Sequence, residues 1–264
     1  MTKAGDMTVS GPLDEATSRA LDDLVRRHRA AEGVGMQVIT MLGGRAETLL
    51  RRLPAEVRLN LEGATRRALE IAADAAARSR SRVPDTSDWL NTALTTAMGA
   101  VGGMGGLPTA MAELPVTTTV LLRAIQGIAS EHGFDPADPA VRMDCLQVFA
   151  ASGPLERDDG ADVAFLAARV SLTGASISGL ITRLAPRLGA VLGQKLAAQA
   201  VPVLGAAAGA AINWSFTSYY QEMAHVYFGL KRLAIESDYD HATLVEEFRM
   251  RLGEASDGLQ AQRP

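Results

Sequence analysis

The side chains best placed to do chemistry stand at the edges of two long uncharged stretches. Residues 89–112 and 196–221 contain no Asp, Glu, Lys or Arg; Glu113 follows the first stretch and Lys195 precedes the second. An unpaired charge in such apolar surroundings costs several kcal/mol unless it reaches water. We therefore predict that Glu113 and Lys195 form an ion pair that joins two segments far apart in the sequence.

The polar residues around this pair leave two interpretations open. One is a structural hydrogen-bond network that holds helices together. The other is a polar pocket between helices that binds a ligand head group or transfers a proton. The candidate residues are Glu113, Thr117, Arg123, Lys195, Gln199, Asn213, Glu222 and His225.

Glu222 and His225 have the Glu-x-x-His spacing of helices that bind a carboxylate-bridged metal pair. Such a site needs a second copy of the motif and two further carboxylates. The similar spacing at Asp238 and His241 lies in a predicted turn. We therefore predict no metal and no cofactor, and keep a metal-dependent enzyme as an alternative.

Other enzyme signatures are absent from the sequence. It has no Gly-x-Ser-x-Gly elbow, no Walker loop, no His-Glu-x-x-His motif and no dinucleotide fingerprint. The net charge of −4 and the lack of a basic, aromatic-rich block argue against nucleic acid as a partner. Cys145 is the only cysteine, so no intramolecular disulfide can form. The N-terminus lacks the pattern of a secretory signal, which predicts a cytoplasmic protein.

Small residues recur at every fourth position between Gly189 and Asn213. This spacing predicts one helix with a flat side, a glycine-zipper stripe against which a second helix packs closely. We expect the second helix to come from the segment around Glu113. The stripe consists of Gly189, Gly193, Ala197, Gly205 and Gly209.

Composition and periodicity predict an all-α protein, a multi-helix bundle with long Ala/Gly-rich helices. Only 5% of the residues are aromatic, and Ala, Leu and Val dominate the apolar fraction. Helices are predicted at about 14–33, 34–53, 55–80, 115–131, 139–152, 161–184, 189–236 and 242–252. We expect one domain: a disordered tail (1–12), a helical lead-in (13–87), core helices (88–236) and a C-terminal helix with a tail (237–264).

The two uncharged segments are long enough to cross a bilayer, but glycines and prolines interrupt both. Buried core helices or a membrane-dipping hairpin therefore fit better than two independent spans. Between residues 45 and 82, nine arginines stand against five acidic residues, an excess that would favour an anionic membrane surface.

Two blocks of sequence resemble the EcsC family, named after a protein encoded beside an ABC transporter in Gram-positive bacteria. The first is GGMGGLPTAMAELPVTTTVLLRAI at residues 102–125, continuing through the helix that starts at Pro139. The second is GQKLAAQAVPVLGAAAGAAIN at residues 193–213, continuing to Phe228. The resemblance covers about residues 30–236 and implies a mostly helical, membrane-associated bacterial protein. It implies no established activity and no catalytic residues.

Together these observations favour a non-enzymatic helical module, associated peripherally with the inner face of the cytoplasmic membrane and accessory to a transporter or envelope process. The expected partner is a membrane surface or lipid, and a protein partner or a homo-oligomer stays open. The first alternative is a hydrolase or metal-dependent enzyme with a polar pocket around Glu113, Lys195 and Glu222. The second is a soluble scaffold or interaction protein.

Overall fold

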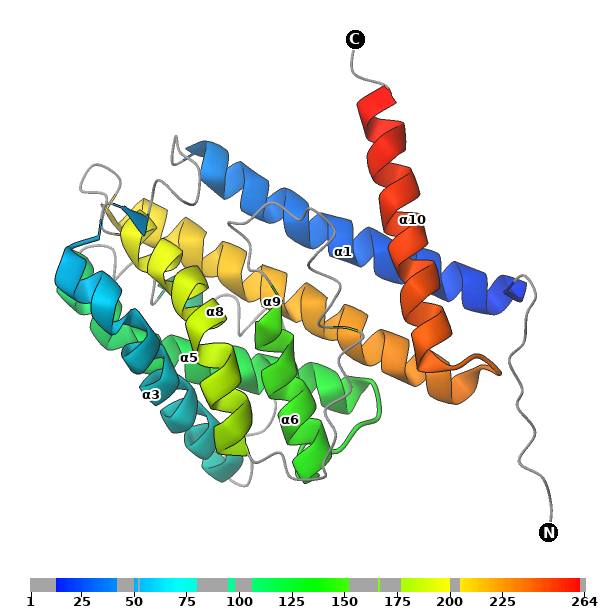
Figure 1. The fold of residues 1–264 in the computed structure, drawn as a ribbon, viewed down its shortest axis with the longest axis horizontal. Coiled ribbons are helices and arrows are strands. Elements are labelled where there is room, and N and C mark those ends of the chain that lie inside the picture. The colour runs from blue at the N-terminus through cyan, green and yellow to red at the C-terminus, as the bar shows by residue number, and fades with distance from the viewer. Residues whose placement is uncertain are drawn as a thin grey trace.

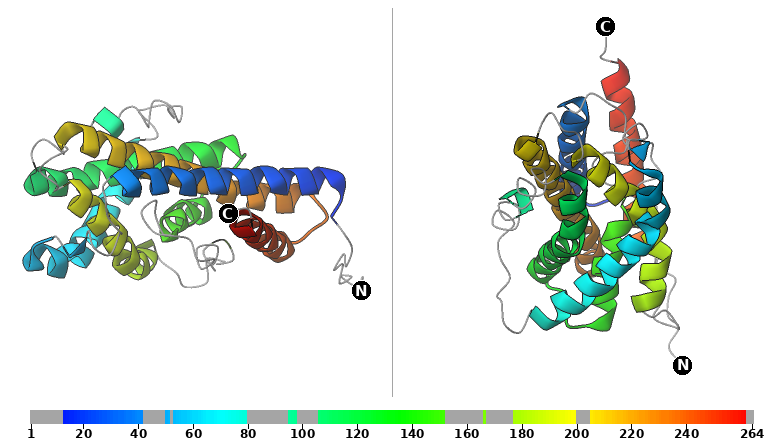
Figure 2. Two further views of the ribbon diagram at one scale, coloured as in Figure 1. Left: turned by 90° about the horizontal axis from the view of Figure 1, so that it is seen from above. Right: turned by 90° about the vertical axis from the view of Figure 1, so that its left-hand side faces the viewer.

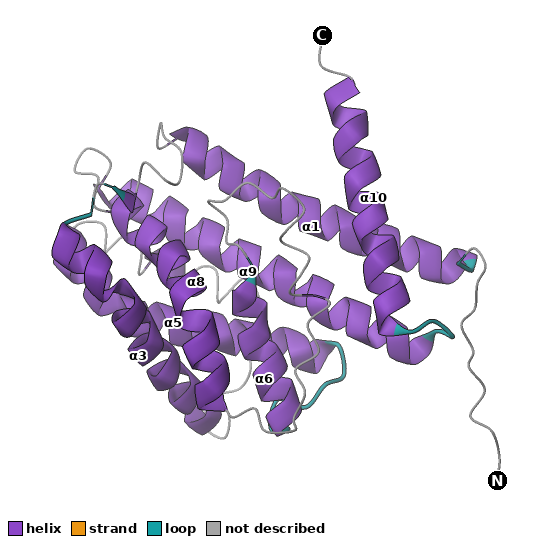
Figure 3. Ribbon diagram, in the orientation of Figure 1, coloured by secondary structure: helices purple, strands orange, loops and turns teal. Residues whose placement is uncertain are grey.

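The computed structural model describes residues 13–41, 50, 51, 53–79, 95–97, 106–151, 166, 177–199 and 205–261. Within these ranges the chain is helical and contains no strand, which confirms the predicted all-α class (Figure 3). The elements are α1 (Glu15–Met41), α3 (Ala55–Ser79), α5 (Gly106–Glu131), α6 (Pro139–Gln147), the short 3-10 helix η1 (Val148–Ala150), α8 (Ile177–Gln199), α9 (Gly205–Glu236) and α10 (His241–Ala261).

The helices form a bundle around α9. Helix α1 lies along α9 in the opposite direction, while α3, α5 and α8 pack together on another side (Figure 1). Helix α6 lies beside α5 and α8, and α10 crosses α1 steeply, with its C-terminal part extending past it (Figures 1 and 2). One cluster of buried apolar side chains connects the bundle, with fully buried members that include Leu21, Leu69, Ile125, Leu196 and Phe228. Both the predicted lead-in and the predicted core helices thus contribute to the same core.

Helix α1 is longer than predicted, because Gly33 does not end it. The helix continues to Met41, although we had expected it to end at Gly33 and a second helix to run from 34 to 53. Gly33 is exposed, and nothing lies within 4 Å of where its Cβ would be. A glycine inside a helix costs about 1 kcal/mol relative to alanine, too little to stop a helix that packs along α9.

Helix α5 begins at Gly106 and passes through Pro115, whereas the sequence predicted a clear helix only from Pro115. In the turn around the proline, the hydroxyls of Thr118 and Thr119 donate to the carbonyl oxygens of Leu114 and Pro115, both at 2.7 Å. The predicted end at residues 132–133 is confirmed. Gly133 adopts φ +81°, and the amide of Phe134 donates to the carbonyl of Ala129 at 2.9 Å, the pattern of a glycine C-cap.

The start of α6 is confirmed at Asp138. Its carboxylate accepts a hydrogen bond of 2.7 Å from the amide of Ala140, and Pro139 occupies the first turn. Helix α10 extends to Ala261, further than the predicted end at residue 252. The predicted tail at 1–12, most of the predicted helix at 161–184 and the glycine cluster at 99–105 lie outside the described residues.

The small-residue stripe is divided between two helices, so the prediction of one helix from 189 to 236 was wrong. Helix α8 starts at Ile177, passes through Pro186 and ends at Gln199, and α9 starts at Gly205. Gly209 is buried on α9 and Ala197 on α8.

The α8 part of the stripe packs against α3, which corrects the expected partner, the segment around Glu113. A Cβ on Gly189 would lie 3.6 Å from the Cα of Glu62, and one on Gly193 would lie 2.7 Å from a methyl carbon of Leu61. Pattern alone could not identify this partner, because the spacing of small residues shows that a helix comes close but not which one.

Candidate functional site

Three helices bring Glu113, Lys195 and Asn213 together inside the bundle. Glu113 lies near the start of α5, Lys195 near the end of α8 and Asn213 near the start of α9. The Lys195 side chain is fully buried and that of Glu113 is 7% exposed. Asn213 is also fully buried. These three residues, with Thr117, Thr95 and Thr217, form what we call the polar cluster.

One oxygen of Glu113 is the centre of the cluster. Its Oε1 accepts hydrogen bonds from Lys195 Nζ at 3.2 Å, Asn213 Nδ2 at 2.6 Å and Thr117 Oγ1 at 2.9 Å. The predicted contact between Glu113 and Lys195 is therefore present. It joins α5 to α8, and Asn213 adds α9 to the same contact.

Two threonines that the sequence analysis did not select extend the cluster. Asn213 Nδ2 also donates to the carbonyl oxygen of Thr95 at 2.8 Å. The hydroxyls of Thr95 and Thr217 lie 2.6 Å apart, and Thr217 donates to the carbonyl of Asn213 at 2.8 Å. Thr217 follows Asn213 by four residues, one helical turn, so its spacing offered a signal that we did not use. Thr95 lies in an uncharged stretch and offered none.

Burial governs the electrostatics of the cluster. Desolvation lowers the pKa of the Lys195 ammonium from its ordinary value, and the charge and hydrogen bond of Glu113 oppose that shift. Glu113 Oε2 and Asn213 Oδ1 are both buried and have no hydrogen-bond partner within the described chain. One carboxylate oxygen thus accepts three hydrogen bonds, while two buried acceptor atoms receive none. Each buried acceptor without a hydrogen bond lowers the stability of the fold.

Of the other candidate residues of the predicted pocket, Arg123, Glu222 and His225 lie away from this cluster. Arg123 follows Glu113 by ten residues on α5, which separates them by about 15 Å along the helix axis. Glu222 follows Asn213 by nine residues on α9 and forms an ion pair of 2.9 Å with Arg27 of α1. Gln199 ends α8, and its side chain lies outside those described.

His225 makes a separate contact with His132, just after α5. His132 Nε2 lies 3.2 Å from His225 Nδ1, and the two rings meet edge to face. Burial lowers the pKa of His132 from 6.5 to about 4, and the nearby His225, Arg27 and Arg232 act in the same direction. Within the described part of the chain, no three His, Cys, Asp or Glu residues lie close enough to hold a metal ion.

A second buried carboxylate, Asp144 of α6, was missed by the sequence analysis. It accepts a hydrogen bond of 2.8 Å from the Tyr227 hydroxyl and forms an ion pair with Lys231, both on α9. Burial, followed by the charge of Asp144, raises the pKa of Tyr227 well above its ordinary range. This group attaches α6 to α9 at a single turn of each helix.

None of the described helices is both long enough and apolar enough to span a bilayer. A family model described as the EcsC protein family matches residues 54–233. No curated protein and no solved structure shows significant similarity to the chain. The matched range contains every residue of the polar cluster and extends from the end of the α1–α3 connection to the last turn of α9.

Proposed function

Because the chain belongs to the EcsC protein family, we propose that it is a non-enzymatic helical module that associates peripherally with a membrane. We place it in a bacterium, at the inner face of the cytoplasmic membrane, where it is an accessory to a transporter or envelope process. The observation that supports this proposal is that the two uncharged segments come together in the bundle.

One border of each segment, at Glu113 and at Lys195, lies in the polar cluster. The start of α5, the end of α8 and the start of α9 all lie at the left-hand end in Figure 1. The polar cluster holds them together, since Glu113 follows the first uncharged segment directly and Lys195 precedes the second. We call the starts of α5 and α9 and the end of α8 the uncharged end, because among the described residues they carry no Asp, Glu, Lys or Arg other than the paired Glu113 and Lys195. These segments support a membrane contact, since they bring no other charge into it that must be dehydrated.

Exposed apolar side chains lie beside the uncharged end. Val116 on α5 is 52% exposed and Trp214 on α9 is 38% exposed. Tryptophan favours the membrane–water interface, where its ring is half in the apolar layer and its N–H can find a polar partner. These two residues supply a shallow apolar contact without any span.

Charge in the basic stretch is a second contribution to the proposed membrane contact. In the stretch from 45 to 82, the described side chains include Arg51, Arg58, Arg66 and Arg67, balanced by Glu56, Glu62, Glu70 and Asp74. The excess arginines belong to positions whose side chains are outside the described set. The full stretch keeps its excess of arginines, so we expect binding to an anionic membrane to weaken as the salt concentration rises.

Vesicle flotation tests the proposal. Purified protein should float with phosphatidylcholine vesicles that contain phosphatidylglycerol, and Trp214→Glu should reduce the floated fraction about tenfold, because it brings a charge into the contact. Ile235→Glu is the matched control: Ile235 is 63% exposed and lies about 31 Å along α9 from Trp214. Protein that stays at the bottom at low salt, with no membrane fraction in cells, would instead support the soluble scaffold. Equal losses for the two variants would dismiss the uncharged end as the contact.

The alternative of an enzyme or ligand-binding protein now rests on a smaller set of residues. Glu113, Lys195 and Asn213 support it, because a buried lysine of lowered pKa lies beside two unused acceptors. Glu222 and His225 lie elsewhere and lend it no support. Metal analysis of the purified protein tests the metal-dependent form: stoichiometric Fe, Mn or Zn that is lost in His225→Ala would favour it.

A further inference from the structure

Helix α3 has one side that is exposed along the first half of the helix. The helix packs against α5 and α8 and lies at the border of the bundle (Figures 1 and 2). Its exposed side carries Leu59, whose side chain is 83% exposed, more than any other large apolar side chain described. The next in order, Ile235 on α9, is 63% exposed. A leucine that projects this far into water marks the surface of α3 for a closer look at what surrounds it.

Four residues form a symmetric pattern around this leucine. Glu56, Leu59, Gly63 and Arg66 follow one another at intervals of three, four and three residues, and all four are exposed. This spacing places them on one side of a helix, which we call the α3 face. Nothing lies within 4 Å of where a Cβ on Gly63 would be. Neither Glu56 nor Arg66 forms an ion pair within the described part of the chain.

The α3 face is complementary to itself when two copies of the helix run antiparallel. If Leu59 of one copy lies on Gly63 of the other, Glu56 lies opposite Arg66, because both pairs are centred on Leu61. A two-fold axis repeats every contact with the copies exchanged. Each leucine therefore enters the open space beside the other copy's glycine, as side chains do when helices pack, and each glutamate meets an arginine.

Other pairings of the same face bring like charges together. A parallel pair would put every residue opposite its own copy, so Glu56 would face Glu56 and Arg66 would face Arg66. An antiparallel pair centred on Gly63 would put Glu56 opposite Glu70. Like charges in contact disfavour an association strongly. Charge therefore selects the antiparallel arrangement centred on Leu61.

A second exposed apolar residue of α3, Ile71, does not lead to a competing arrangement. Ile71 is 45% exposed. An antiparallel pair that brings Leu59 onto Ile71 is centred on Thr65, and it puts Glu56 opposite Asp74. The apolar contact in that arrangement would be opposed by two carboxylate pairs.

We propose that the α3 face is a homodimer contact, through which two copies of this chain pair with antiparallel α3 helices centred on Leu61. The occupant of the face is a second copy because the face supplies both halves of each contact, the leucine with its recess and the glutamate with its arginine. One helix from each copy makes a small interface, so the dimer is reversible. This contact goes beyond the proposed membrane contact, which uses the uncharged end.

Sedimentation equilibrium of the full chain, without lipid or detergent, tests the proposal. The wild type should form dimers as its concentration rises, and Leu59→Glu should raise the dimer dissociation constant about tenfold or more, because it brings a charge into the apolar contact. Ile235→Glu is the matched control, since it makes the same kind of change at an exposed residue of α9 and should leave the dissociation constant unchanged. The absence of lipid makes the outcome independent of the membrane contact.

Charge reversal tests the arrangement of the two helices. Glu56→Lys and Arg66→Glu should each weaken the dimer about tenfold, because each creates two like-charge contacts. An equal mixture of the two variants should recover wild-type affinity, since the mixed dimer pairs opposite charges at both positions. Arg58→Glu is the control on the same helix: Arg58 is exposed but lies about 100° around the helix from Leu59, on the side away from Gly63.

Three results would each overturn the proposal. One is a wild-type chain that stays monomeric up to about 1 mM, the weak end of the affinity range. The second is the same dissociation constant for Leu59→Glu and Ile235→Glu. The third is a mixture of the two charge-reversed variants that associates no better than either variant alone. Circular dichroism checks that every variant keeps its helical content, which exposed positions should allow.

Discussion

The Glu113 carboxylate connects α5, α8 and α9 through a single oxygen. Three donors share its Oε1, and one of them is the ammonium of a fully buried lysine. A buried ion pair gains little over apolar side chains of the same size, yet a partner left alone in the core is strongly destabilising. The cluster therefore makes the fold depend on both partners at once.

A double-mutant cycle measures this dependence. Glu113→Ala or Lys195→Ala alone should lower the free energy of unfolding by about 3 kcal/mol or more, and Glu113→Leu with Lys195→Met should recover much of the loss. Urea unfolding provides the values, and Glu236→Ala, which breaks the exposed pair with Arg232, should cost less than about 1 kcal/mol. Additive single changes would show that the two groups do not interact in solution.

His132 predicts a loss of stability in acid. Its pKa is lowered from 6.5 to about 4 in the folded chain, so the fold favours the neutral ring. This contribution is complete above pH 6.5 and is lost as the pH falls toward 4, because the unfolded chain takes up the proton first. Urea unfolding should therefore show a smaller stability loss for His132→Asn than for wild type over this range. Parallel curves would contradict the assignment to His132.

At the scale of elements, the contact between α3 and α8 depends on two glycines in different surroundings. A Cβ on Gly193 would lie 2.7 Å from Leu61 and 2.8 Å from Leu50, whereas a Cβ on Gly189 would meet its nearest atoms at 3.5 Å or more. One added methyl group would overpack the structure at Gly193, whereas Gly189 has room for it.

Alanine scanning of this pair separates packing from helix propensity. Alanine gains about 1 kcal/mol over glycine inside a helix, so Gly189→Ala should leave the melting temperature unchanged or raise it. Gly193→Ala should lower it, because overpacking costs about 1–3 kcal/mol. A higher melting temperature for Gly193→Ala would mean that α3 and α8 are further apart than described.

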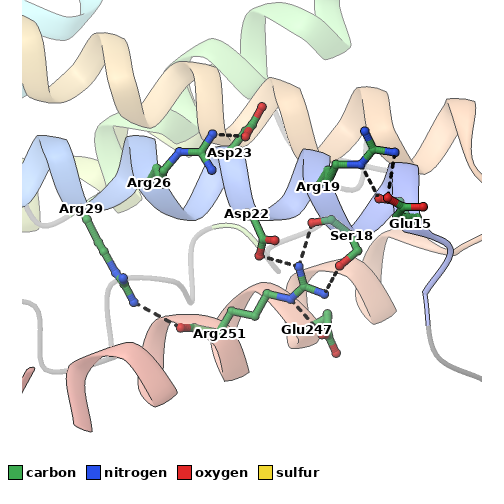
Figure 4. A network of polar contacts seen from close by, with 9 residues as sticks. All are labelled: Glu15, Ser18, Arg19, Asp22, Asp23, Arg26, Arg29, Glu247 and Arg251. Carbon is green, nitrogen blue, oxygen red and sulfur yellow. Dashed lines mark hydrogen bonds and ion pairs between the residues drawn. The ribbon is translucent and has the colours of Figure 1, made fainter. Parts of the chain in front are cut away.

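At the scale of the whole molecule, Arg251 of α10 contacts Ser18 and Asp22 of α1 (Figure 4), and loss of these contacts should loosen α10 without opening the bundle. Cys145, the only cysteine of the chain, is fully buried on α6 and reports opening of the bundle through its reaction with a thiol reagent. Arg251→Ala should leave the labelling rate of Cys145 unchanged, whereas Glu113→Ala should raise it by disrupting the contact of α5, α8 and α9. Faster labelling in the arginine variant would show that loss of the contact between α10 and α1 also opens the bundle.

The sequence by itself determined the helical class, the capped start at Asp138, the end of α5 at Gly133 and the pairing of Glu113 with Lys195. The first three depend on local periodicity and backbone geometry, which a short segment carries with it. The pairing could be predicted because burying a lone charge costs so much free energy that a charged residue in apolar surroundings needs an oppositely charged partner or contact with water.

Tertiary structure decided the rest. Whether Gly33 and Pro186 end a helix depends on how their helices pack. The free energy of this packing outweighs the helix-propensity cost, which is about 1 kcal/mol for glycine and about 3 kcal/mol for proline relative to alanine. The partner of Gly193, the separation of Glu222 from Glu113, and the role of Arg251 in joining α10 to α1 all involve residues distant in the sequence. Their identity follows from the arrangement of whole helices, because a helix presents each side chain to whichever neighbour packs on that face.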